Sequence, residues 1–123
     1  MATLVYAKIS TIHYANGSAD IALQDRENQV ILKVPFLAWF YEMPKAGDIV
    51  AALIEEANGR IQKSVILGKI FIGENTPKNT GKDMFCKEFA DGANMKYKAG
   101  ECQFNMDRVR VNELICKRVI QEE

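Results

Sequence analysis

The residues of this sequence best suited to acid–base chemistry are carboxylates, and their spacing argues against a catalytic pair. Glu55 and Glu56 are adjacent. Neighbouring side chains on a strand point to opposite faces, so these two carboxylates cannot act together on one substrate. Asp20, Asp25 and Asp48 stand in or beside predicted turns, where solvated charges are usual. We expect all five to be turn or edge charges, with Asp48 capping a tight turn.

Nucleophilic and metal chemistry find equally little support. His13 is the single histidine, and no serine or cysteine stands in a recognisable arrangement with it. Cys86, Cys102 and Cys116 are widely spaced and form no CxxC pair, so reduced, partly buried thiols of a protein folded in the cytosol fit better than disulfides or a zinc site. No glycine-rich phosphate-binding motif occurs. The sequence therefore predicts no enzyme, no metal and no cofactor.

Composition favours an ordinary folded protein. The 123 residues are 48% hydrophobic and 26% charged, which fits one domain with a short appendage. Lys and Arg balance Asp and Glu at 16 each, which argues against a dedicated nucleic-acid binder. The N-terminus has no secretory signal pattern, and the apolar runs are far shorter than the ~20 residues of a membrane-spanning helix.

Period-two alternation predicts an all-β fold with five strands in residues 1–72. The first strand is expected over Thr3–Tyr14, where Val5, Ala7 and Ile9 share one face. Turn signals at residues 15–18, 25–28 and 58–59 separate it from strands near residues 21–23, 30–34, 47–56 and 60–72. Five strands with short turns favour a small closed barrel or a compact sandwich.

A dense aromatic cluster interrupts the strands between Pro35 and Pro44. It reads as an irregular loop or a single helical turn and contains Phe36, Trp39, Phe40 and Tyr41. Two interpretations stay open. The rings could dock on a partner protein, since aromatic residues dominate interface hot spots, or they could plug one end of the barrel.

The last third of the chain cannot supply a core of its own. Residues 73–82 are rich in Gly, Asn, Thr and Pro and are typical of a linker. Residues 83–123 return to short strands with turns at Asp91-Gly92 and Ala99-Gly100. These strands hold too few apolar positions to fold alone, so they must pack on something else. The most economical partner is copies of the same segment.

These residues resemble the signature of the phage baseplate assembly protein V and type VI secretion spike family. In that family a "GD-x-V-x-V" strand leads through a variable turn to "VLG-x-x-Y/F-x-x-x-N-x-P". The matching positions here are Gly47, Asp48, Val50, Val65, Leu67, Gly68, Phe71, Asn75 and Pro77. Downstream, "KEFADGANMKY", with Asp91 and Gly92, resembles the family's "K-x-F-x-DGT-x-I-x-Y" at the start of its stalk.

The resemblance implies an architecture and a role. Residues 1–72 would form an oligonucleotide/oligosaccharide-binding (OB) barrel, residues 73–82 a linker, and residues 83–123 an intertwined trimeric β-prism or β-helix. The homotrimer would sit beneath a tail hub protein as the central spike or baseplate plug of a contractile phage tail or tail-like bacteriocin, made in the bacterial cytoplasm. Its stalk would transmit force to the cell envelope. The expected trimer core comprises Phe85, Phe89, Phe104, Val109, Val111, Leu114 and Cys116.

Alternatives remain at the level of sequence. Val109 to Cys116 could line a trimeric prism or lie as a strand against the chain's own barrel. The apex could be blunt or capped by a separate tip protein, because no His-x-His iron motif is present. An OB barrel can also bind single-stranded nucleic acid or carbohydrate. That alternative lacks a basic excess, because acidic residues intersperse the lysines between residues 78 and 98.

Overall fold

The computed structural model describes residues 2–26, 29–38 and 41–122. The chain forms two compact units, Met1–Thr76 and Pro77–Glu123. In the described residues, strands and their connections make up both units, apart from one turn of 3-10 helix at Tyr14–Asn16. The prediction of an all-β fold is therefore confirmed. None of the described segments forms a helix with the length and apolarity needed to span a membrane.

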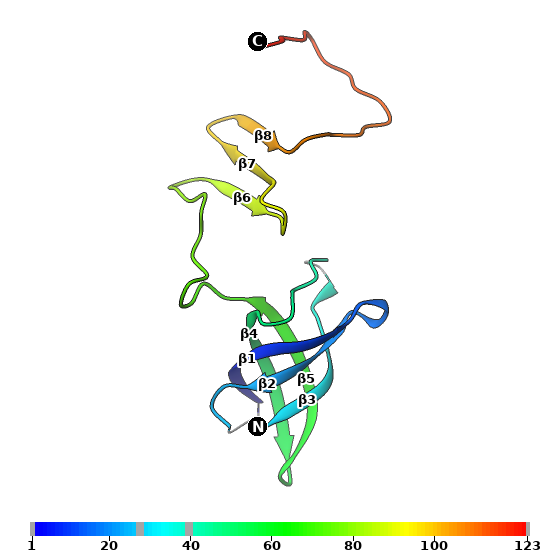
Figure 1. The fold of residues 1–123 in the computed structure, drawn as a ribbon, viewed down its shortest axis with the longest axis vertical. Coiled ribbons are helices and arrows are strands. Elements are labelled where there is room, and N and C mark those ends of the chain that lie inside the picture. Colours follow the sequence, from blue (N-terminus) through cyan, green and yellow to red (C-terminus); the bar gives the residue numbers. More distant parts are fainter. Residues whose placement is uncertain (1, 27–28, 39–40, 123) are drawn as a thin grey trace. The chain divides into compact units, whose positions relative to one another are not determined.

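The first unit is a five-stranded antiparallel sheet that curls strongly into a half-barrel (Figure 1). Its strand order is β3-β2-β1-β4-β5. The bounds are β1 Ala2–His13, β2 Ser18–Leu23, β3 Val30–Pro35, β4 Ile49–Ala57 and β5 Arg60–Lys69. A single curled sheet fits the barrel expectation and excludes the two-sheet sandwich. The last strand ends at Lys69 and not at Ile72 as predicted.

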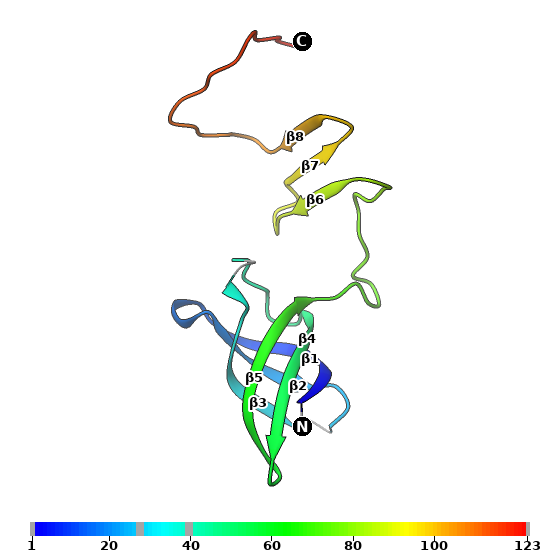
Figure 2. The same ribbon diagram turned by 180° about the vertical axis from the view of Figure 1, so that it is seen from behind.

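The two edge strands of this sheet, β3 and β5, approach each other where β3 ends (Figures 1 and 2). Phe36 forms a parallel bridge with Ile66. The Leu37 N–H donates to the Ile66 carbonyl at 3.3 Å. Contact between the edges therefore depends on the residues that follow β3, and the fold is a half-barrel whose edges meet at one end.

The core of the first unit lies on the concave side of the sheet. In β1, β2 and β4 alternate residues point inward, as the period-two pattern predicted. In β3 the alternation is broken at the register shift, so Ile31 and Val34 pack inward and Val30 and Leu32 are exposed. Ile9, Ile21, Val34, Val50 and Ile54 are the largest side chains in this core that are completely buried. Ile12, Ile31, Phe36 and Ile61 pack around its margin. The first unit thus buries a continuous apolar cluster from its own strands.

The second unit is a three-stranded antiparallel sheet of order β6-β7-β8. Its strands are β6 Phe85–Glu88, β7 Asn94–Lys98 and β8 Glu101–Asn105. Ala99 and Gly100 join β7 to β8 with φ of 53° and 87°, the left-handed pair of a tight hairpin. Residues 106–122 form no strand (Figure 1), so the strands expected between Val109 and Cys116 are absent from the single chain.

A carboxylate ties three strands of the half-barrel together where their register shifts. Asp20 lies at the irregularity in the pairing of β2 with both β1 and β3. Its carboxylate accepts the Lys33 N–H at 2.9 Å and lies 2.9 Å from His13 Nε2. Lys33 has a left-handed φ of 54°, so its N–H binds the Asp20 side chain where the regular pairing is interrupted. The Lys33 N–H, and secondarily the His13 hydrogen bond, lower the pKa of Asp20.

We predict that Asp20→Ala lowers the thermal unfolding midpoint at pH 7 and that this difference shrinks in acid. Because the pKa of Asp20 is lowered in the fold, its contribution is present above the ordinary pKa near 4 and is lost as the pH falls through the lowered value. Thermal melts followed by circular dichroism between pH 2 and 7 measure this. Asp25→Ala, in an exposed turn, is the control. An equal pH dependence in both variants would show that the hydrogen bonds of the Asp20 carboxylate do not stabilise the fold.

Candidate interaction surface

The two faces of the β6-β7-β8 sheet differ sharply in chemistry. The strand register places Phe85, Tyr97 and Cys102 in one cross-strand row. Lys87, Met95 and Phe104 form the neighbouring row on the same side. We call Phe85, Met95, Tyr97, Cys102 and Phe104 the apolar face. The opposite side carries Cys86, Glu88, Asn94, Lys96, Lys98, Glu101, Gln103 and Asn105, and is called the polar face.

The residues of the second unit do not cover the apolar face. Phe85 is 62% exposed, Phe104 52% and Tyr97 48%. None of the described residues from 77 to 122 is buried. Burying apolar area releases roughly 25 cal/mol per Å², so this arrangement forgoes the main driving force of folding. Clustered exposed aromatic side chains are typical of a surface that binds another protein.

The structure brings together part of the predicted trimer core. Phe85 and Phe104 lie in adjacent rows of the apolar face. Phe89 extends the same alternation one step beyond β6, and its N–H donates to the Ala93 carbonyl at 2.9 Å. The other four predicted residues lie in the strand-free segment and are exposed: Val109, Val111, Leu114 and Cys116.

The trimer core predicted from the sequence lacks three members of this face: Met95, Tyr97 and Cys102. Met95 and Tyr97 alternate with Lys96 and Lys98, which is the period-two signal of a two-faced strand. Placing the hairpin at Ala99-Gly100 pairs Tyr97 with Cys102 and Met95 with Phe104. The alternation is therefore present in the sequence, but it identifies the facing residues only once the turn fixes the strand register.

Both edges of this small sheet are open in the single chain. β7 pairs on two sides, whereas β6 and β8 each pair on one side within the described residues. An open edge presents a row of backbone donors and acceptors that can pair with another chain. The second unit thus offers two kinds of contact to a partner, an apolar face and two strand edges.

The aromatic cluster of the first unit is divided between two environments. Phe36 packs against the half-barrel core. Tyr41 is 89% exposed and has a left-handed φ of 45°. Trp39 and Phe40 lie outside the described residues. Phe36 therefore occupies the position expected of a barrel plug, whereas Tyr41 stands where a docking residue would.

Turns and a bulge contain four of the residues that carry the family resemblance, namely Gly47, Asp48, Gly68 and Asn75. The Asp48 carboxylate accepts the Lys45 N–H at 2.7 Å, in the turn that includes Gly47, as its capping interpretation predicts. Gly68, with φ of 149°, stands at a register shift between β4 and β5. The Asn75 amide donates to the Ile70 carbonyl at 2.8 Å and closes the turn after β5.

Other motif residues lie in the second unit. Pro77 is its first residue. The Asp91 carboxylate accepts the Ala93 N–H at 3.0 Å, and Gly92 has a left-handed φ of 92°. This pair therefore folds β6 back onto β7. The geometry of these turns accounts for the spacing of these motif residues.

The other polar candidates from the sequence occupy structural positions. Glu56 forms an ion pair with Arg26. Glu55 is exposed and pairs across the sheet with Lys63. In the described ranges, no three or more His, Cys, Asp and Glu residues group so as to hold a metal ion. Cys102 and Cys116 are exposed rather than partly buried, and only Cys86 is half-buried.

Neither a protein-family model nor a curated protein matches this chain.

The two environments of the aromatic cluster predict opposite mutational outcomes. Phe36→Ala should lower the free energy of unfolding by about 1–3 kcal/mol, because it removes a ring packed on the core. Tyr41→Ala should change it by less than about 0.5 kcal/mol, because its ring is in solvent. Urea titration followed by circular dichroism measures both values. Equal destabilisation would show that Tyr41 also belongs to the packed plug.

Proposed function

We propose that the protein is the trimeric central spike, or baseplate plug, of a contractile phage tail or tail-like bacteriocin. The observation that carries this proposal is the uncovered apolar face of the second unit. The residues of the second unit leave Phe85, Tyr97 and Phe104 exposed. Copies arranged around a common axis give each of them an apolar neighbour.

A closed ring also accounts for the open strand edges. In a cyclic trimer each subunit presents one surface to the next and a different surface to the previous one. Pairing of β8 in one copy with β6 in the next meets this condition and leaves no edge exposed. The segment after β8, with Val109, Val111 and Leu114 exposed, would then gain strand partners from the neighbouring copies.

The first unit supports the barrel half of the proposal. Its strand order, with β3 and β5 approaching in parallel through Phe36 and Ile66, is compatible with the partly open five-stranded barrel of an OB fold. We propose that this barrel docks beneath the tail hub protein and that Tyr41 belongs to the docking surface. A separate tip protein would cap the stalk where an apex is needed.

The mechanism is force transmission rather than catalysis. Contraction of the tail would drive the trimer against the cell envelope, with the stalk making transient contact first. Strands paired between chains share the load over many hydrogen bonds, and such assemblies unfold slowly. The two-faced sheet suits this task, because its apolar side would be sealed inside the stalk.

The oligomeric state tests the proposal directly. Size-exclusion chromatography with light scattering should give three times the 13.8 kDa of one chain. Phe104→Glu should convert the trimer to monomer, because it places a charge in the sealed interior. Gln103→Glu is the matched control, since the neighbouring residue on β8 belongs to the polar face. A stable wild-type monomer would remove the mechanical account.

Truncation separates the two units. A chain ending at Lys82 retains the complete core of the first unit and should fold as a half-barrel. We expect it to be monomeric at micromolar concentration by light scattering, with a β-type circular dichroism spectrum. If the truncated chain stays fully trimeric, the second unit is not what assembles the protein.

A further inference from the structure

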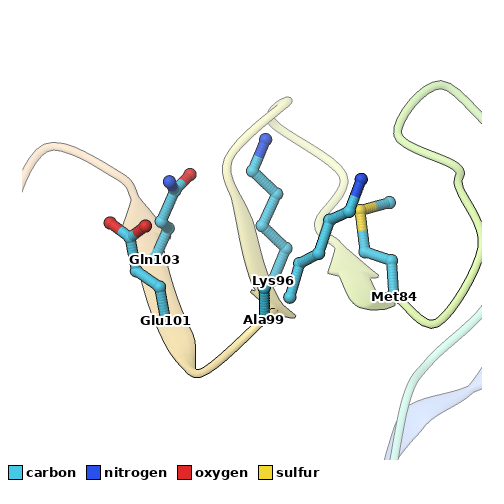
Figure 3. A pocket seen from close by; sticks show the side chains of 6 residues that line it. Met84, Lys96, Ala99, Glu101 and Gln103 are labelled. Carbon is cyan, nitrogen blue, oxygen red and sulfur yellow. The ribbon is translucent and has the colours of Figure 1, made fainter.

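The polar face of the second unit carries a cavity that the proposed assembly does not use. The cavity has a volume of about 380 Å³ and is lined by Met84, Lys96, Lys98, Ala99, Glu101 and Gln103. This lies within the range of roughly 300–1,000 Å³ that small-molecule sites occupy. Figure 3 shows the side chains of Lys96, Glu101, Gln103 and Met84 extending to the same side of the strands.

Strand register explains why these side chains converge. Lys96 stands directly opposite Gln103, and Lys98 directly opposite Glu101. Met84 precedes β6 and falls on the same side by alternation. A Cβ added at Gly81 would lie 3.9 Å from Lys98 Nζ, so the loop at Gly81 passes beside this ammonium group. One chain therefore supplies the complete site.

The residues that line the cavity carry a net positive charge. The ammonium groups of Lys96 and Lys98 and the carboxylate of Glu101 together leave one positive charge. In the described part of the chain, neither Lys96 nor Lys98 takes part in an ion pair. A ligand with a single negative charge would neutralise this site.

The chemical groups that line the cavity further restrict the class of ligand. Lysines act as separate point charges, and each of the two ammonium groups can bind one oxygen of a phosphate group. A phosphate monoester carries close to two negative charges at neutral pH, and Glu101 would repel the second one. Glu101 and Gln103 can accept hydrogen bonds from hydroxyl groups. Met84 and Ala99 offer apolar contact to a carbon chain.

We propose that this cavity binds a phosphodiester that bridges hydroxyl-bearing units, as in a polyol phosphate. Lys96 and Lys98 hold the phosphodiester oxygens, and Glu101 and Gln103 bind the adjacent hydroxyl groups. The chemistry can come from a soluble polyol phosphate or from the headgroup of an anionic lipid. The site does not depend on the oligomeric state, because all its residues come from one chain and lie opposite the apolar face.

Titration of the full-length protein with glycerophosphoglycerol, followed by amide chemical shifts in NMR spectra, tests the proposal. We expect shifts concentrated in residues 96–103. Lys98→Gln should weaken binding about tenfold or more, because it removes a charge-assisted hydrogen bond. The absence of shifts at these residues would overturn the proposal, whether or not the chain is trimeric.

Gly81 gives a variant that leaves every lining side chain in place. Gly81→Asp should weaken binding of glycerophosphoglycerol about tenfold or more, because its carboxylate would stand beside Lys98 Nζ. Gly81→Ala, which adds the Cβ without charge, should bind like the wild type. Equal losses in the two variants would contradict the electrostatic basis of the site.

Two further probes fix the ligand class and its source. Gluconate, a polyol with one carboxylate, tests the ligand class: we expect it to bind more weakly than glycerophosphoglycerol, and equal binding would overturn the phosphodiester assignment. Co-sedimentation with phosphatidylglycerol vesicles, lost in Lys98→Gln, would assign the phosphodiester to a lipid headgroup. Shifts with glycerophosphoglycerol without co-sedimentation would assign it to a soluble polyol phosphate.

Discussion

The exposed aromatic rings of the second unit impose the constraint on which the rest of this protein depends. Two tight turns, at Asp91-Gly92 and at Ala99-Gly100, set the register of three short strands. That register collects the large apolar side chains on one side. A sheet of three strands has no second layer to cover that side, and it is marginally stable alone. The covering layer must come from outside this unit.

The first unit covers the apolar side of its sheet with its own residues. Its sheet curls until its own concave side encloses Ile9, Ile21, Val50 and Ile54. A curled sheet needs breaks in the regular strand pairing. This sheet has one where the Lys33 N–H donates to the Asp20 carboxylate and another at the bulge beside Gly68. The chain therefore joins a unit that satisfies its own burial to one that does not. The proposed spike, with a fixed base and an assembling stalk, would need this division.

Sequence patterns predicted the strands of the half-barrel because their alternation reflects burial on one side. They could not predict the hydrogen bond between His13 and Asp20, because these residues are apart in the sequence and meet only when the turn at Gly17 folds β1 onto β2. The end of β5 was overestimated because Ile70, Phe71 and Ile72 continue an apolar run after the ladder has stopped. Strands were expected from Val109 to Cys116, but extended residues become a strand only with a partner. One chain offers none there.

Sheet geometry favours a ring of copies over a simple pair. Two copies packed face to face would cover both apolar faces, but β6 and β8 of each copy would keep their open edges. A ring in which β8 pairs with β6 of the next copy covers faces and edges together. In such a ring the apolar face must point to the axis, so Lys96, Lys98, Glu101 and Gln103 point to solvent. The burial that would assemble the stalk thereby leaves the charged cavity accessible on every copy.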